Sequence, residues 1–244
     1  MKILSPNLTP LKELENLDIL NYKGVLIDID DTLYSYKYAH KESLKTCYSE
    51  LKIKSKINKE LNSIVNKSFR EFSKIYRNAR TQVYESLQPN GSCRSRLLAF
   101  QIIFEQVSKT AKKNKLFANY CLAREFEEIY WSALIKNITP NPYVYDFIEK
   151  SFNQGMIICA VSDMQTAIQV RKLEKLGIQK YIHFLVTSEE TGVEKPDSKI
   201  FNLALNKINL CSKEVIMIGD SLEKDYFGAE QLGIKSFLID ISND

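Results

Sequence analysis

The sequence has few histidines, and its cysteines lack the spacing of a metal site. Its 244 residues include two histidines, His40 and His183, and neither lies in a metal-ligand spacing. The five cysteines are scattered, odd in number and without a CxxC pair, which argues against a zinc site and a disulfide framework. We therefore expect reduced thiols in a cytoplasmic protein.

Long apolar segments are also missing. No apolar run approaches the roughly 18 residues that a membrane helix needs. The first twenty residues contain no continuous apolar stretch of the kind found in a secretory signal. The formal charge of +4 and pI near 8.6 are too mild to indicate nucleic acid binding. We expect neither a membrane nor a nucleic acid as a partner, and the basic helical segment described below is the one feature that would favour nucleic acid.

Short apolar runs alternate with helical patterns from about residue 138 onward. This alternation predicts right-handed βαβ units and a parallel sheet with helices on both faces. The upstream segment GVLIDID is expected to join the sheet as a central strand. The predicted strands are 24–30, 155–162, 183–189, 214–220 and 235–240, and the predicted helices between them are 166–177, 197–210 and 223–232.

Residues 36 to about 137 have a different character. They are rich in Lys, Glu, Asn and Arg and show helical periodicity without strong strand alternation. The stretch ITPNPYVYD, with two prolines, marks the return to the α/β pattern. We predict an α/β core domain of residues 1–36 and 138–244, with an all-helical domain of residues 37–137 inserted after the first strand.

Carboxylates, hydroxyls and a lysine follow the predicted strands at their carboxyl ends, where ligands collect in parallel sheets. Mg²⁺ prefers oxygen ligands and is often held by carboxylates together with substrate phosphate. A carboxylate can attack phosphorus, and a second one can shuttle a proton. The pattern therefore favours phosphoryl chemistry. The candidate residues are Asp28, Asp30, Thr32, Ser162, Lys195, Asp220 and Asp225.

Four short motifs in this chain resemble those of the haloacid dehalogenase superfamily of phosphohydrolases. They are DIDDT (28–32), the serine that ends AVS (162), KP (195–196) and GDSLEKD (219–225), and they occur in the family's order. The resemblance implies a Rossmann-like core. It also implies that the helical insertion is the cap of the subgroup in which the cap lies over the active site, excludes water and selects the substrate.

The resemblance further implies catalytic roles. Asp28 would attack phosphorus and form an aspartyl-phosphate. Asp30 would protonate the leaving oxygen and then activate water. Ser162 and Lys195 would bind the phosphoryl group, and Lys195 would also stabilise the charge of the nucleophile.

A metal site is implied by the same resemblance. Asp28, the backbone carbonyl of Asp30 and Asp220 would ligate Mg²⁺. Thr32 would hold the loop after the first strand at the substrate. Asp225 would orient metal-bound water or the motif lysine.

Two positions depart from the family pattern. Position 31 is Asp where many members have glycine, and Asp163 follows the motif serine where asparagine or glycine is frequent. A carboxylate at position 163 would repel a bound phosphate. For single residues the simpler readings are a surface location for Lys195, a helix N-cap for Ser162 and an exposed early-helix carboxylate for Asp225.

We expect a Mg²⁺-dependent phosphatase that acts on a small phosphorylated metabolite, a nucleotide or a sugar phosphate. The alternatives are a 2-haloacid dehalogenase or a phosphomutase on the same fold, or a non-catalytic binding or regulatory protein. Asp30 argues against the dehalogenase, because halide leaves without protonation and such members typically lack an acid there. The complete motif set argues against a non-catalytic protein.

Overall fold

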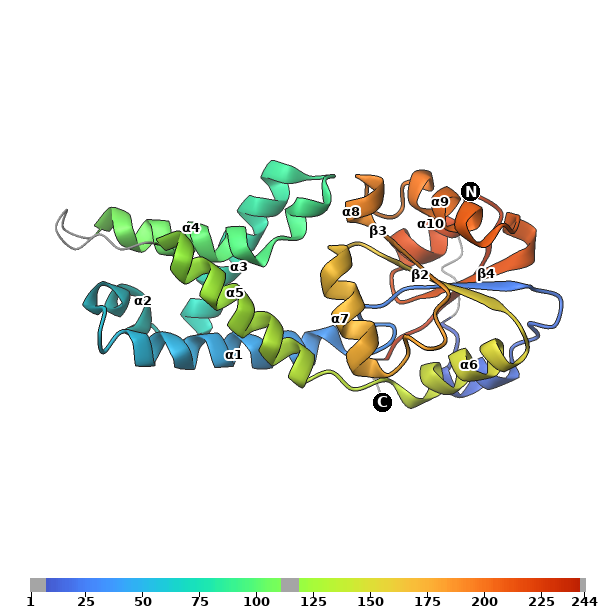
Figure 1. The fold of residues 1–244 in the computed structure, drawn as a ribbon, viewed down its shortest axis with the longest axis horizontal. Helices are drawn as coiled ribbons and strands as arrows, with labels where there is room; N and C mark the ends of the chain where they lie inside the picture. The colour runs from blue at the N-terminus through green and yellow to red at the C-terminus, as the bar shows by residue number, and fades with distance from the viewer. Residues whose placement is uncertain (1–7, 111–118, 242–244) are drawn as a thin grey trace. The chain divides into compact units, whose positions relative to one another are not determined.

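The central feature of the computed structural model, which describes residues 8–110 and 119–241, is a five-stranded sheet (Figure 1). The strand order is β3-β2-β1-β4-β5, and every neighbouring pair is parallel. The prediction of a parallel α/β fold with β1 as a central strand is confirmed. The strands are β1 (Gly24–Ile27), β2 (Ile157–Ser162), β3 (Phe184–Thr187), β4 (Val215–Gly219) and β5 (Lys235–Leu238).

The middle strands are almost entirely apolar, which suits parallel strands covered by helices on both faces of the sheet. Val25, Leu26 and Ile27 are fully buried, as expected for a central parallel strand. Ile27 pairs with Ala160 of β2 and with Ile218 of β4. This register brings the ends of β1, β2 and β4 to one edge of the sheet.

Helix α9 (Ser198–Ile208) packs on one face of the sheet. Its Phe201 and Ala204 share a buried cluster with Leu26, Cys159 and Met217 from three strands. Side chains of neighbouring strand residues point to the opposite face. The remaining helices of this part of the chain are η1 (Leu11–Asn16), α6 (Pro142–Asn153), α7 (Thr166–Leu176), α8 (Ser188–Thr191), η5 (Ser212–Glu214), the π-helix η6 (Leu222–Phe227) and α10 (Gly228–Glu230).

A second compact unit consists of helices, and its described residues are 37–88, 92–110 and 119–137. The sheet unit consists of the described residues 8–36, 89–91 and 138–241. Stacked and edge-on aromatic rings, among them Tyr76, Phe100 and Tyr130, fill the centre of the helical unit. Its elements are α1 (Tyr36–Lys54), η2 (Lys59–Leu61), α2 (Asn62–Val65), α3 (Phe69–Leu87), η3 (Gly91–Arg94), α4 (Arg96–Thr110) and α5 (Asn119–Lys136).

Some segments differ from their predictions. The predicted helix 223–232 is a π-helix followed by the short α10. Within the region of helical periodicity, a capping box of Ser68 and Glu71 starts α3. The described cysteines are all free thiols. Within the two described ranges, no helix has both the length and the apolarity to span a bilayer.

Candidate active site

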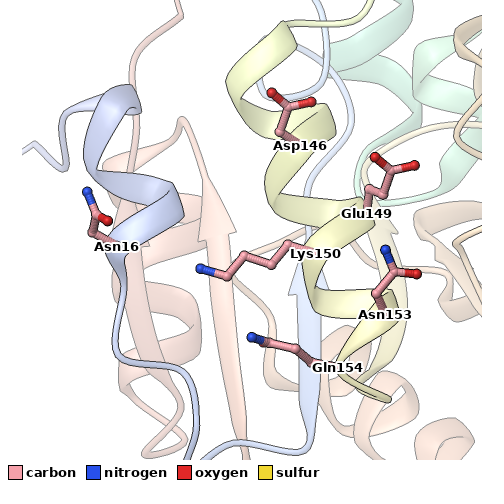
Figure 2. A pocket seen from close by; sticks show the side chains of 6 residues that line it. All are labelled: Asn16, Asp146, Glu149, Lys150, Asn153 and Gln154. Atoms are coloured by element: carbon pink, nitrogen blue, oxygen red, sulfur yellow. The ribbon is translucent and has the colours of Figure 1, made fainter.

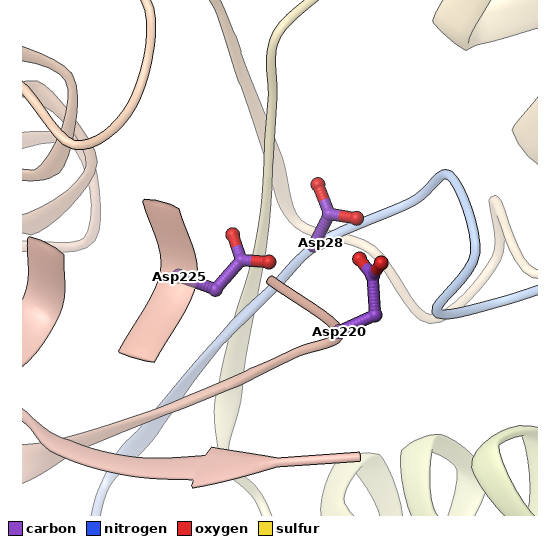
Figure 3. Close-up of side chains that lie close together, drawn as sticks. All are labelled: Asp28, Asp220 and Asp225. Carbon is purple, nitrogen blue, oxygen red and sulfur yellow. The ribbon is translucent and has the colours of Figure 1, made fainter. Parts of the chain in front are cut away.

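Three carboxylates meet where the central strands end (Figure 3). Asp28 directly follows β1, Asp220 directly follows β4, and Asp225 lies in the π-helix η6. One carboxylate oxygen from each lies within 4.8 Å of the others. Asp28 and Asp225 are buried, and Asp220 is partly exposed. The strand register therefore gathers charges that are 192 to 197 positions apart in the sequence, counted from Asp28.

Lys195 supplies the positive charge among these carboxylates. Its buried Nζ donates to Oδ1 of Asp28 at 2.5 Å and to Oδ1 of Asp225 at 2.6 Å. It also donates to the carbonyl oxygen of Val161 at 2.9 Å. Burial lowers the pKa of Lys195, but Asp225 and then Asp28 raise it more strongly, so the amine stays protonated. The simpler readings of Lys195 and Asp225 as surface residues are wrong.

The carboxylates carry more negative charge than Lys195 neutralises. Burial is the main reason why the pKa of Asp28 lies well above its usual value, and Asp225 and Asp220 raise it further while Lys195 opposes them. Burial, followed by the charges of Asp225 and Asp31, raises the pKa of Asp220 to about 7. A second cation at this point would relieve the repulsion.

The donor chemistry fits a hard divalent cation. All three side chains offer oxygen, which Mg²⁺ prefers. Both oxygens of Asp225 already accept hydrogen bonds, one from Lys195 and one from the backbone N–H of Ser221 at 3.0 Å. Asp28 and Asp220 are therefore the more accessible ligands of the cluster. The Thr32 hydroxyl lies 3.3 Å from Oδ2 of Asp28 and 3.4 Å from Oδ1 of Asp220.

Asp163 holds the loop that carries the motif lysine. Its Oδ1 accepts the backbone N–H of Lys195 at 2.8 Å, and its Oδ2 accepts the Nζ of Lys224 at 2.7 Å. Lys224 also donates to Glu194 at 3.0 Å. The negative charge that made Asp163 a difficulty for phosphate binding is thus compensated by Lys224.

Ser162 ends β2 and is almost fully buried. Its hydroxyl accepts a hydrogen bond from Nε2 of Gln169. The N-cap of α7 is Gln165, so the simpler reading of Ser162 as an N-cap is wrong. The structure thus places the motif serine at the same sheet edge as Asp28.

Asp30 lies in its own cluster of donors. Nζ of Lys172 donates to Oδ1 over 2.6 Å, and the hydroxyl of Tyr34 donates to the same oxygen. Nε2 of Gln169 donates to Oδ2 over 3.2 Å. Burial acts to raise the pKa of Asp30, but Lys172 and these hydrogen bonds lower it below its usual value.

Sequence reasoning missed Lys172, Gln169 and Tyr34 as neighbours of Asp30. The sequence does hold one signal for the lysine. On the predicted helix 166–177, position 172 falls between the apolar Ile168 and Leu176 at intervals of four, on the face that is buried. A lysine in an apolar stripe is unusual unless it has a partner.

A separate surface pocket of about 610 Å³ lies beside α6 and η1 (Figure 2). Its lining is polar, and none of the sequence-predicted site residues belongs to it. This pocket is therefore distinct from the carboxylate cluster at the strand ends. The lining residues are Asn16, Asp146, Glu149, Lys150, Asn153 and Gln154.

The chain is similar to known hydrolases over most of its length. The family described as haloacid dehalogenase-like hydrolase matches residues 25–239. The chain is 30% identical over 222 residues to ribulose-1,5-bisphosphate 5-phosphatase of Halopiger xanaduensis, covering 91% of this chain and 86% of that protein. It is 28% identical to glyceraldehyde 3-phosphate phosphatase of Methanopyrus kandleri, covering 87% and 81%.

A solved structure has the same fold. The HAD-hydrolase YfnB from Bacillus subtilis, bound to magnesium, superimposes with a TM-score of 0.62 at 19% identity, covering 88% of this chain and 87% of that one. The family match, the sequence relatives and the fold agree with the four motifs. The chain belongs to the haloacid dehalogenase-like hydrolase family.

Proposed function

We propose that this hydrolase is a Mg²⁺-dependent phosphatase that cleaves a small phosphorylated metabolite through an aspartyl-phosphate. The family and the phosphatases among its relatives make it a phosphoric monoester hydrolase. One observation carries the mechanism: the buried Lys195 holds Asp28 at the sheet edge beside Asp220. A carboxylate with a fixed cation at one oxygen can present the other to phosphorus.

In the first half-reaction a carboxylate oxygen of Asp28 forms a bond to phosphorus. The bond between phosphorus and the ester oxygen breaks, and its electron pair stays on the leaving oxygen. Asp30 is ionised in the free enzyme because Lys172 lowers its pKa, so it takes up a proton from the ester, which binds as the monoanion. It then gives this proton to the leaving oxygen, and the product leaves as an alcohol. Lys195 and Ser162 bind the phosphoryl oxygens and stabilise their charge.

In the second half-reaction water attacks the phosphorus of the aspartyl-phosphate. Asp30, now ionised, takes a proton from that water. The bond between phosphorus and the Asp28 oxygen breaks, which regenerates the carboxylate and releases inorganic phosphate. Asp30 passes this proton to the departing phosphate and returns to its ionised form for the next cycle.

Asp28, Asp220 and the backbone carbonyl of Asp30 would hold Mg²⁺. The ion, when bound, supplies charge neutralisation for the carboxylates and the phosphoryl group. Asp225 supports the site through its ion pair with Lys195. Thr32 supports it through its hydroxyl, which lies near both Asp28 and Asp220.

A sugar phosphate is the substrate class that the relatives favour, since the two named phosphatases act on phosphorylated sugars. A nucleotide is the second candidate. We assign substrate selection to the helical residues 37–137, acting as a cap. Asp30 disfavours a 2-haloacid dehalogenase, because an acid at this position serves a leaving group that needs a proton.

Replacement of Asp28 by Asn tests the mechanism. We expect phosphate release from 4-nitrophenyl phosphate with Mg²⁺ to fall to background, because an amide cannot form the acyl-phosphate. The matched control is Asp146→Asn, an exposed change of the same type on α6, which should retain full activity. Turnover by the Asp28 variant at the native rate would reject the proposal. A panel of sugar phosphates and nucleotides then identifies the substrate.

A further inference from the structure

A second buried lysine, outside the four sequence motifs, holds the carboxylate of Asp30. Lys172 lies on α7, its side chain is fully buried, and its Nζ is 2.6 Å from Oδ1 of Asp30. The rings of Tyr34 and Tyr36 flank the amine, with centroids 5.8 and 5.9 Å from Nζ. A buried ammonium group is costly unless it is paired. The pairing therefore ties the position of Asp30 to α7.

The two carboxylate oxygens of Asp30 accept hydrogen bonds of different number and strength. Oδ1 accepts from the charged Lys172 and from the Tyr34 hydroxyl. Within the described residues, Oδ2 accepts one longer hydrogen bond of 3.2 Å, from the neutral amide of Gln169. That amide is shared, because it also donates to Ser162. The Asp30 side chain remains 28% exposed, so Oδ2 is the oxygen that can exchange its partner.

We propose that Lys172, together with Tyr34, is a positioning residue for proton transfer. It fixes Oδ1 of Asp30, so that Oδ2 is the oxygen that gives a proton to the leaving group and takes one from water. The inference rests on the proposed function, since that function assigns the acid and base role to Asp30. Lys172 acts through Asp30, whereas Lys195 contacts the nucleophile Asp28.

This role makes a prediction about leaving groups. A 4-nitrophenolate departs as a stable anion and needs little help from an acid. An alkoxide needs a proton as it departs, so the rate of cleavage of an alkyl phosphate depends on the correct orientation of the Asp30 carboxyl group. The ratio kcat/KM reports the half-reaction in which the leaving group departs. Both esters share the later hydrolysis of the aspartyl-phosphate, so kcat separates them less.

The experiment compares Lys172→Met with the native chain on glycerol phosphate and 4-nitrophenyl phosphate, both with Mg²⁺. We expect kcat/KM to fall by about 10²-fold on the alkyl ester and by less than about tenfold on the aryl ester. The matched control is Lys175→Met, an exposed lysine of the same helix, which should change neither value. Tyr34→Phe removes only a hydroxyl group. It should lower kcat/KM more for the alkyl ester than for the aryl ester, by a smaller factor than Lys172→Met, and it tests the proposal even if Lys172→Met does not fold.

Two results would overturn the positioning role. Equal losses on both esters would indicate a direct contact with the phosphoryl group, which the esters have in common, or a general structural role. Unchanged kcat/KM on both esters would remove Lys172 from the reaction. Asp28→Asn separates this test from that of the proposed function. If Asp28→Asn is inactive and Lys172→Met shows no leaving-group bias, only the positioning role is rejected. If Asp28→Asn stays active, the phosphatase mechanism itself is rejected.

Discussion

The amine of Lys195 makes a cluster of buried carboxylates possible. It pairs with Asp28 at the end of β1 and with Asp225 in the π-helix, and it donates to the carbonyl of Val161 in β2. Removing a charge from water is costly, and these three contacts offset that cost for Lys195. The same residue therefore stabilises the folded state and orients the nucleophile.

Lys195→Met should destabilise the protein and abolish phosphatase activity. Breaking a buried ion pair leaves uncompensated charge, and we expect the free energy of unfolding to fall by about 3–5 kcal/mol in urea titrations without metal. Lys195→Met combined with Asp225→Asn should regain part of this loss, because it removes one of the stranded carboxylates. Lys213→Met, an exposed change of the same type, is the control. A double variant less stable than the single one would contradict this account.

Site residues that directly follow a strand could be placed from the sequence, but the partners of Asp30 on helix α7 could not. Asp28 and Asp220 follow apolar runs, so their meeting at one sheet edge follows from parallel pairing. Lys172 lies 142 positions from Asp30, and no local pattern in the sequence indicates such a contact.

The sequence indicated only part of the role of Asp31, at a position where many family members have glycine. Its φ of 62° is a left-handed conformation that favours glycine, and its Oδ1 accepts the backbone N–H of Tyr36.

At the level of secondary structure, the strands were predictable because buried parallel strands are continuous apolar runs. The π-helix η6 was not, since six residues of a wider helix leave no separate period in the sequence. Its packing against β4 is close. A Cβ at Gly219 would lie 2.4 Å from the carboxyl carbon of Asp225, so only glycine fits at the end of this strand.

The helical unit buries one of its arginines against aromatic rings. Arg77 is exposed on α3, but Arg96 at the start of α4 is buried. Its guanidinium carbon lies 5.5 Å from the ring centroid of Tyr130 and 5.1 Å from that of Trp131. His40 of α1 shares this region, and its Nδ1 is 2.7 Å from the Tyr130 hydroxyl.

His40 should make the protein less stable in weak acid. Burial, followed by the charges of Arg96, Arg80 and Arg77, lowers the pKa of His40 from 6.5 to about 4. Below pH 6.5 the histidine becomes protonated in the unfolded chain but stays neutral in the folded chain. The folded state therefore loses stability as the pH falls from 6.5 towards 4.

We expect the free energy of unfolding of the native chain, measured relative to His40→Gln, to fall by about 3 kcal/mol between pH 7 and pH 4. The comparison with the variant removes contributions from carboxylates, which are common to both chains. Urea titrations at a series of pH values measure it. Parallel pH profiles for the two chains would show that His40 titrates normally in the fold.

The molecule as a whole has a modest net charge of +4, but the site formed by Asp28, Asp220 and Asp225 is strongly negative. The carboxylates of Asp28 and Asp220 have raised pKa values, and each such group binds a proton more tightly in the folded chain than in the unfolded chain. Proton binding by these groups therefore stabilises the folded chain at low pH. The contribution of Asp220 is lost as the pH rises towards 7. A bound cation would replace the proton and restore the stability.

Mg²⁺ should therefore stabilise the whole protein, and more so in mild alkali than in mild acid. At a concentration 100 times its Kd it would add about 2.7 kcal/mol, which raises Tm by roughly 5–10 °C for a chain of this size. Because the pKa of Asp220 is about 7, protons compete with the ion at pH 6, and we expect a larger shift in Tm at pH 8. Asp220→Asn should remove most of the shift, while Asp146→Asn, far from these strand ends in sequence and exposed, should keep it. A shift in Tm that is independent of pH and survives in Asp220→Asn would mean that Mg²⁺ binds elsewhere, and that the carboxylates at the ends of β1 and β4 tolerate one another by holding protons.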